Sequence, residues 1–215
     1  MSTGPKTVAG IAVPDSRLAR EAGELVREAA SPTVFHHSRR VFFWGSLRGL
    51  VRGLSADPEL LYVGALFHDL GLTERYGRTD QRFEIDGADE ARRFLQSHGI
   101  GSADADLVWQ SIALHTTPGI PWHMAPEIAL VTAGVEVDVL GMGLAEIEAP
   151  ARAEVVALHP RVDFKQRILQ EFTAGIADRP RTAFGNVKAD VLERYSPGFE
   201  RENFVDTVLG SAWPE

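Results

Sequence analysis

The chain has 215 residues, a net charge of −8 and no cysteine. This length fits one domain of generous size, which can bury a substantial core without covalent staples. The lack of cysteine excludes disulfides, thiolate metal sites and a cysteine nucleophile, and the acidic balance argues against a nucleic-acid binder. A small-molecule substrate is compatible with this composition.

Residues 1–14 contain Gly, Pro, Ser and Thr around one apolar patch, Val8 to Val13. The patch is shorter than the core of a signal peptide, and no segment of the chain is long enough to cross a membrane. We therefore expect a loosely ordered tail over residues 1–14, one domain over residues 15–215, and a cytoplasmic location.

Nearly every periodic segment predicts a helix, and we find no convincing alternating strand and no internal repeat. Ser31 before Pro32, for example, is the favoured order of an N-cap and a first helical residue. The expected helices cover residues 15–28, 31–54, 60–71, 86–97, 102–115, 127–144, 162–176, 186–194 and 201–209. The sequence predicts an all-α protein, a single compact bundle with a C-terminal helical elaboration.

The helix over residues 60–71 is apolar on every face. Such a helix is buried, and this one is too short to span a membrane. It ends on the adjacent residues His68 and Asp69. Polar groups in a core must be hydrogen-bonded, paired or bound to a metal, and on its own this pair is explained by a His and an Asp that satisfy one another.

The helix before it places two adjacent histidines in apolar surroundings. His37 shares a face with Val34, Val41 and Trp44, so we expect it to point inward, whereas His36 lies on a more mixed face. Together with the His-Asp pair and the acidic residues described next, these histidines supply the nitrogen and oxygen donors that a divalent metal needs.

The apolar helix over residues 127–144 carries two acidic candidates, Asp138 and Glu136. Asp138 lies on a face with Gly134 and Gly141, and these glycines would let a neighbouring helix or a metal approach closely. We expect Asp138 to be the inward carboxylate, with Glu136 as its rival.

The order His37, His68-Asp69, Asp138 resembles the H…HD…D signature of the HD-domain superfamily of metal-dependent hydrolases. Further segments look like the cyanamide hydratase branch of that superfamily, and together they cover roughly residues 30–215. These segments are residues 37–42, 67–73, 82–88, 112–117, 138–141, 203–206 and 213–215.

The resemblance implies four metal ligands, His37, His68, Asp69 and Asp138, and one divalent metal ion. Zinc is the ion that the hydratase branch implies, and iron, manganese or nickel would also suit these ligands. The implied activity is hydration of a nitrile-type group, such as cyanamide to urea, by metal-bound hydroxide.

Three other functions stay open. An HD-type phosphohydrolase, a nucleotidase or phosphomonoesterase, would need cationic groups, and Arg75, Arg78 and Arg82 lie in the loop beside the His-Asp pair. An iron-dependent oxygenase would use two metals, but the segment over residues 83–86 lacks the extra histidine that such members carry. The chain could also be a non-enzymatic, metal-stabilised module.

His115 ends an apolar stripe, where we expect it to line the pocket as a hydrogen-bond donor or proton shuttle. A capped core histidine at a helix end is an equal alternative. Glu84 and Asp86 are candidates for a general acid or base, although Asp86 also fits an ordinary N-cap. The candidates for substrate binding are Thr116, Thr117 and Arg82.

The remaining features have simpler readings. We expect structural or loop roles for His98, His123 and His159. Apolar residues near the C-terminus predict either a flap over the core or the face of a homo-oligomer, and they are Phe199, Phe204, Val205, Val208 and Leu209.

Overall fold

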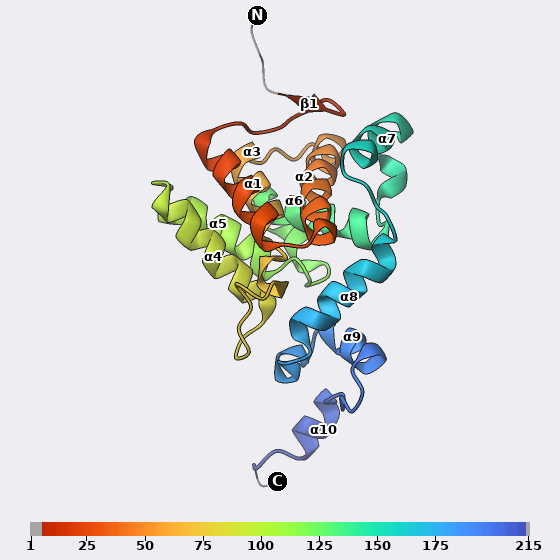
Figure 1. Ribbon diagram of the computed structural model, residues 1–215. Helices are drawn as coiled ribbons and strands as arrows, with labels where there is room; N and C mark the ends of the chain where they lie inside the picture. Colours follow the sequence, from red (N-terminus) through yellow and green to blue (C-terminus); the bar gives the residue numbers. More distant parts are fainter. Residues whose placement is uncertain (1–5, 214–215) are drawn as a thin grey trace, which may run out of the picture.

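The computed structural model describes residues 6–213, and helices dominate it (Figure 1). The all-α prediction is confirmed. The helices are α1 Arg17–Ala29, α2 Pro32–Arg52, α3 Pro58–Phe67, α4 Phe83–Ser97, α5 Ser102–Ala113, α6 Pro126–Val135, α7 Ala149–Leu158, α8 Phe164–Ile176, α9 Lys188–Tyr195 and α10 Phe204–Leu209.

Several helix starts follow from local capping. The hydroxyl oxygens of Ser16 and Ser31 accept backbone N–H groups in the first turns of α1 and α2, and the Asp57 carboxylate does so for α3. Pro32 and Pro58 occupy the first turn, where the missing N–H leaves no bond unmade.

The core forms where α3 is enclosed by α1, α2, α5 and α6, which all contact it. Every residue of α3 from Leu60 to Phe67 is buried, as its apolar sequence predicts. Beside it α2 packs closely on α6, because a Cβ atom at Gly134 would lie 2.2 Å from the backbone oxygen of Val41. The predicted close approach at Gly134 is therefore confirmed.

Gly141 has a different function from the one we expected. A Cβ atom there would meet nothing within 4 Å, but the residue has a φ of +71° and ends the helical segment. The expected continuous helix over residues 127–144 is also wrong, because α6 stops at Val135 and a π-helical turn, Glu136–Leu140, follows.

Two more helix boundaries differ from the prediction. We expected no helix between residues 144 and 162, yet α7 forms there with Pro150 in its first turn, a position that tolerates proline. Helix α4 begins at Phe83 with Arg82 as its N-cap residue, so Asp86 lies inside the first turn and does not cap the helix.

A short hairpin precedes α1. Strand β1, Thr7–Val8, pairs antiparallel with strand β2, Ile11–Ala12, and Val8 is buried against the core. The sequence did not indicate this hairpin within the expected tail. Residues 1–5 of that tail, and the last two residues of the C-terminal match, lie outside the described residues.

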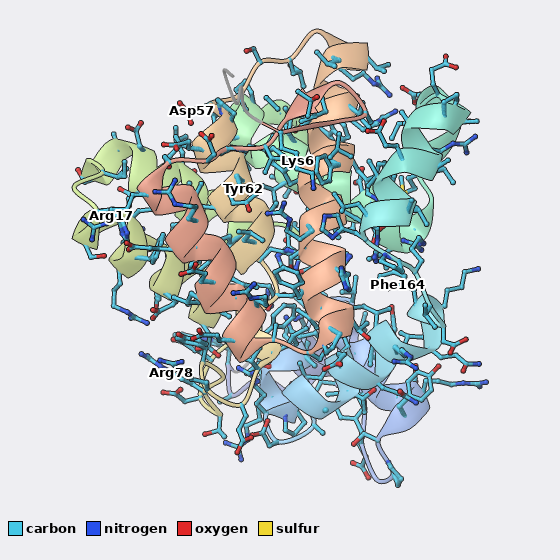
Figure 2. The ribbon with its side chains drawn as sticks, turned by 45° about the horizontal axis from the view of Figure 1, so that its top comes forward. Lys6, Arg17, Asp57, Tyr62, Arg78 and Phe164 are labelled. Atoms are coloured by element: carbon cyan, nitrogen blue, oxygen red, sulfur yellow. The ribbon has the colours of Figure 1, made fainter. Side chains whose placement is uncertain are left out.

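The C-terminal elaboration covers one end of the bundle. Helix α8 contacts α2, and Phe164 at its start lies beside that helix (Figure 2). Helix α9 packs on α8, whereas α10 projects away from the body of the protein (Figure 1). Among the described residues, no helix combines the length and apolar character that a membrane span requires.

Candidate metal centre

Three side chains from two helices meet in the core. His37 comes from the middle of α2, while His68 and Asp69 directly follow α3. The Nε2 atoms of His37 and His68 are 3.1 Å apart, and an Asp69 oxygen lies 3.5 Å and 3.3 Å from them. All three are at most 1% exposed, and their donor atoms are close enough to share one metal ion.

The other ring nitrogens show which atoms are free to bind. His68 Nδ1 lies 2.8 Å from the Ala65 carbonyl oxygen, which can only accept, so this nitrogen carries hydrogen. His37 Nδ1 likewise donates to Asp138 Oδ2, at 2.7 Å. In the neutral rings both Nε2 atoms therefore present lone pairs to one another, and a cation or a shared proton is needed between them.

The Asp69 carboxylate strengthens this requirement. Neither of its buried oxygens has a hydrogen-bond partner among the described residues. A buried, unpaired carboxylate is costly, and a divalent metal bound beside two imidazole nitrogens would remove that cost. The donor set of two imidazoles and a carboxylate suits zinc, iron, manganese or nickel.

The pKa shifts of Asp69 and His68 also favour a positive charge in this cluster. Burial alone would raise the pKa of Asp69, but His68 and the other nearby histidines hold it well below its usual range. Burial opposes the charged form of His68, yet Asp69 outweighs this and raises its pKa. Burial lowers the pKa of His37. Asp69 is thus an anion that attracts a cation to this point.

His115, directly after α5, reaches the same place. Its Nδ1 donates to the Ile112 carbonyl oxygen at 2.7 Å, and its buried Nε2 has no hydrogen-bond partner among residues 6–213. That Nε2 lies 3.6 Å from Asp69 Oδ1, and the ring centroid is 4.8 Å from that of His68. The Nδ1 bond matches the alternative of a capped core histidine, and in the neutral ring it leaves Nε2 with a lone pair directed toward Asp69.

Asp138 lies on the outer side of His37. The guanidinium of Arg40 donates to both carboxylate oxygens at 2.9 Å, Trp44 Nε1 donates to Oδ1 at 2.7 Å, and Arg161 also contacts Oδ1. Burial would raise the pKa of Asp138, but His37 and Arg40 outweigh it and hold that pKa well below its usual range. The resemblance implies a metal ligand here, whereas in this structure the carboxylate orients His37 through its Nδ1.

Glu136, the rival of Asp138, lies elsewhere. Its side chain is half-buried and accepts a hydrogen bond from Trp122 Nε1 at 3.1 Å. The expectation that Asp138 and His37 are the inward members of their pairs agrees with the structure, since both are almost fully buried and His36 is only half-buried.

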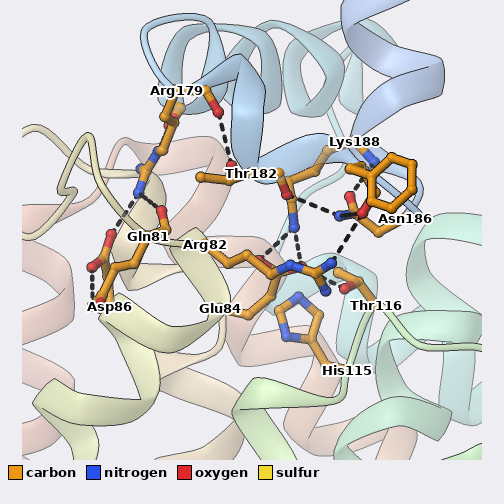
Figure 3. A network of polar contacts seen from close by, with 12 residues as sticks. Gln81, Arg82, Glu84, Asp86, His115, Thr116, Arg179, Thr182, Asn186 and Lys188 are labelled. Carbon is orange, nitrogen blue, oxygen red and sulfur yellow. Dashed lines mark hydrogen bonds and ion pairs between the residues drawn. The ribbon is translucent and has the colours of Figure 1, made fainter. Parts of the chain in front are cut away.

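Glu84 belongs to a buried ion pair close to His115 (Figure 3). Lys188 Nζ, from α9, lies 2.5 Å and 2.7 Å from the two Glu84 oxygens, and the Thr116 hydroxyl donates to Oε1 at 2.6 Å. Burial raises the pKa of Glu84, but Lys188 outweighs it and the net pKa is lowered. Burial also lowers the pKa of Lys188. Nothing in the sequence pattern singled out this lysine.

Asp86 lies at the other end of the polar network shown in Figure 3, away from His115. Its oxygens accept hydrogen bonds from Arg179 Nη1 at 2.5 Å, Gln81 Nε2 at 2.6 Å and the Arg78 backbone N–H at 2.9 Å. The structure therefore does not bring Asp86 to the metal centre. It ties the loop before α4 to the end of α8.

The candidates for substrate binding also separate. Thr116 is fixed to Glu84, whereas Arg82 is exposed and donates to the Phe184 carbonyl oxygen at 3.1 Å. Thr117 is half-buried, and its backbone N–H donates to the Leu114 carbonyl at 2.8 Å. Of these three, Thr116 lies in the network beside His115.

The remaining histidines lie away from the three-residue cluster. His98 bridges the Phe94 carbonyl oxygen and the carboxylate of the half-buried Glu21. His159 is buried against His36, with 3.1 Å between their Nδ1 atoms, and burial lowers its pKa to about 3.

Comparison with known proteins agrees with this geometry. The chain is 31% identical over 115 residues to the cyanamide hydratases DDI2 and DDI3 of Saccharomyces cerevisiae, a match of 52% of this chain and 51% of each relative. It is 53% identical over 59 residues to the bifunctional uridylyltransferase/uridylyl-removing enzyme of Bordetella parapertussis, which covers 27% of this chain but 6% of that protein. The chain thus spans about half the length of the yeast relatives and a small part of the bacterial one.

The family model described as "HD domain" matches residues 34–158, a range that contains His37, His68, Asp69, His115 and Asp138. More than half of the chain lies within this match, and the buried His-His-Asp cluster lies where the motif predicts it. The protein therefore belongs to the HD domain family.

Proposed function

We propose that this protein is a metal-dependent hydratase or hydrolase of a small polar molecule, and that it hydrates a nitrile-type group, converting cyanamide to urea. The observation that carries the proposal is the buried meeting of His37, His68 and Asp69, with the free Nε2 of His115 beside them. Similarity to yeast cyanamide hydratases over half the chain supports the substrate class.

One divalent ion held by His37, His68 and Asp69, with zinc as the proposed ion, would polarise the substrate and lower the pKa of a bound water. His115 would handle the proton: its Nε2 would accept one proton from the attacking water while the water oxygen bonds to the nitrile carbon, and would return that proton to the nitrile nitrogen. This addition of one water gives an imidic acid, and transfer of its remaining O–H proton to the nitrogen gives the amide.

Burial of the centre supports a small substrate. Each of the four residues around it is at most 4% exposed, and Phe83 and Phe164 lie with their ring centroids 5.6 Å from that of His115 and 5.3 Å from that of His37. Exclusion of bulk water strengthens the electrostatic interactions within such a site.

A phosphohydrolase is the second candidate, because the bacterial relatives are uridylyl-removing enzymes. The loop arginines give this reading little support. Arg82 donates to the Phe184 carbonyl, and the Arg75 guanidinium lies 5.3 Å from the centroid of the Tyr76 ring. A phosphate-binding role would need such groups to be free.

The direct test is to incubate zinc-loaded protein with cyanamide and to assay urea, beside a panel of nucleotides scored by phosphate release. We expect urea from the zinc-loaded protein and none above background from metal-free protein or His68→Ala. The matched control is His98→Ala, which removes a histidine outside the cluster and should retain activity.

Metal analysis of protein purified without added metal completes the test. We expect a metal-to-protein ratio near one. No urea from fully loaded, folded protein would overturn the hydratase proposal, and phosphate release would favour the second candidate. A ratio near two with oxygen consumption would favour the oxygenase alternative.

A further inference from the structure

A second site lies on the other side of Asp138 from the histidine cluster. It is a pocket of about 620 Å³ between the π-helical turn, α7 and the start of α8, and Asp138 and Trp44 form part of its wall. His37, His68 and Asp69 do not line it. Pockets that bind small molecules commonly have this size.

The pocket is positively charged, although the protein as a whole is acidic. Arg152, Arg161 and Lys165 line it, and Asp138 is its single acidic residue. Asp138 is already neutralised by the two-pronged bond from Arg40. The three cationic groups therefore exceed the negative charge that is free to balance them.

Arg152 is the clearest unsatisfied group. Its Nε is buried and has no hydrogen-bond partner, and within residues 6–213 neither Arg152 nor Lys165 forms an ion pair. Leaving a charged donor buried and unpartnered is costly. An anionic ligand that accepts from Arg152 would remove this cost.

Part of the pocket wall is apolar. Val139, Leu140 and Leu144 line it, and Leu140 is 66% exposed. An inorganic anion would leave this wall in water. A ligand with a hydrocarbon or aromatic body would cover it and gain free energy from that burial.

We infer that this pocket binds a small organic anion, a phosphate monoester or carboxylate with an apolar body, and that Arg152 is the principal contact for the charged group. The site is distinct from the metal centre and needs no metal. It is also connected to that centre, because Arg161 contacts Asp138, and Asp138 holds Nδ1 of His37. A bound anion would share Arg161 with Asp138.

Phenyl phosphate is a suitable probe, and isothermal titration calorimetry on metal-free protein measures its binding without interference from the metal. We expect saturable binding to the wild type and unchanged binding to His68→Ala. Arg152→Met should weaken it by about tenfold or more, since a charge-assisted bond is lost. Arg152→Lys and the distant, exposed control Arg27→Met should stay within about threefold of wild type.

Absence of saturable binding by the folded wild type, or equal binding by Arg152→Met, would overturn the inference. Inorganic phosphate should bind at least about tenfold more weakly than phenyl phosphate, because it cannot cover the apolar wall. Equal affinity for phenyl phosphate and inorganic phosphate would overturn the inference that the ligand has an apolar body. Neither result depends on whether the protein makes urea.

Discussion

The chemistry of the centre depends on which nitrogen of each histidine is free. Backbone carbonyls of Ala65 and Ile112 hold the Nδ1 atoms of His68 and His115, and Asp138 holds that of His37. All three Nε2 atoms therefore face Asp69. Such outer partners fix the tautomer and the orientation of a metal-binding ring.

His115→Gln tests the proposed proton transfer. Glutamine keeps polarity and approximate size but cannot take up a proton near neutral pH, so we expect kcat/KM for cyanamide to fall by roughly 10²–10⁴. The metal-to-protein ratio should stay near the wild-type value. The kcat/KM for cyanamide and the metal content should be measured on the same samples. Loss of both activity and bound metal would instead indicate that His115 is a metal ligand.

Asp138→Asn tests the buried carboxylate. It would leave Arg40 and Arg161 facing a neutral amide, and breaking a buried ion pair costs about 3–5 kcal/mol. We expect a loss of that order in the free energy of unfolding of metal-free protein, measured in urea. Asp106→Asn, which affects an exposed pair with Arg92, should change it by less than about 1 kcal/mol.

At the scale of elements, the centre is enclosed by helices far apart in sequence. The Lys188–Glu84 pair joins α9 to the start of α4 next to His115. The bond from Arg179 to Asp86 joins the end of α8 to the same helix. The C-terminal elaboration is thus fastened over the site by two buried ion pairs.

The first of these pairs predicts a pH dependence of stability. The pKa of Glu84 is lower in the folded protein than its ordinary value of 4.5, so its contribution is complete above pH 4.5 and is lost as the pH falls through the folded value. The pKa of Lys188 is also lowered, but this lysine loses its proton only at alkaline pH, so it does not change how stability depends on pH below 4.5. Below pH 4.5 the wild type should lose stability more steeply than the double variant Glu84→Gln/Lys188→Met.

Urea unfolding at pH values from 3.5 to 6 measures this difference. The pair Glu154→Gln/Lys6→Met, at exposed positions, is a suitable control and should retain the wild-type slope. Parallel curves for the wild type and the Glu84/Lys188 variant would contradict the prediction.

For the whole molecule, the sequence predicts best what depends on apolar periodicity. The buried helix α3 and the inward side of α2 follow from the positions of Leu60 to Phe67 and of His37. Helix α7 was not predicted, although Pro150 in its first turn is compatible with a helix. Lys188 was missed because a lysine on a polar helix normally faces solvent, and only tertiary packing brings it to Glu84.

Helix α10 and the residues after it, which form a C-terminal arm, bury little apolar surface against the body of the protein. Phe204 and Leu209 of α10 are 70% and 75% exposed, and Trp213 beyond it is 86% exposed. We therefore expect removal of residues 203–215 to change the unfolding free energy of the monomer by no more than about 0.5 kcal/mol. Denaturation at low protein concentration measures this, and a larger loss would show that the arm packs on the body.

The π-helical turn Glu136–Leu140 carries a further consequence. A π turn takes up one residue more than the same stretch of α-helix, and each residue of an α-helix advances the chain by about 100° around its axis. Losing one residue from this turn would rotate Asp138 away from both His37 and Arg40. Related chains can therefore vary the residues around Asp138, but an insertion or deletion in this segment would disconnect it from the histidine it holds.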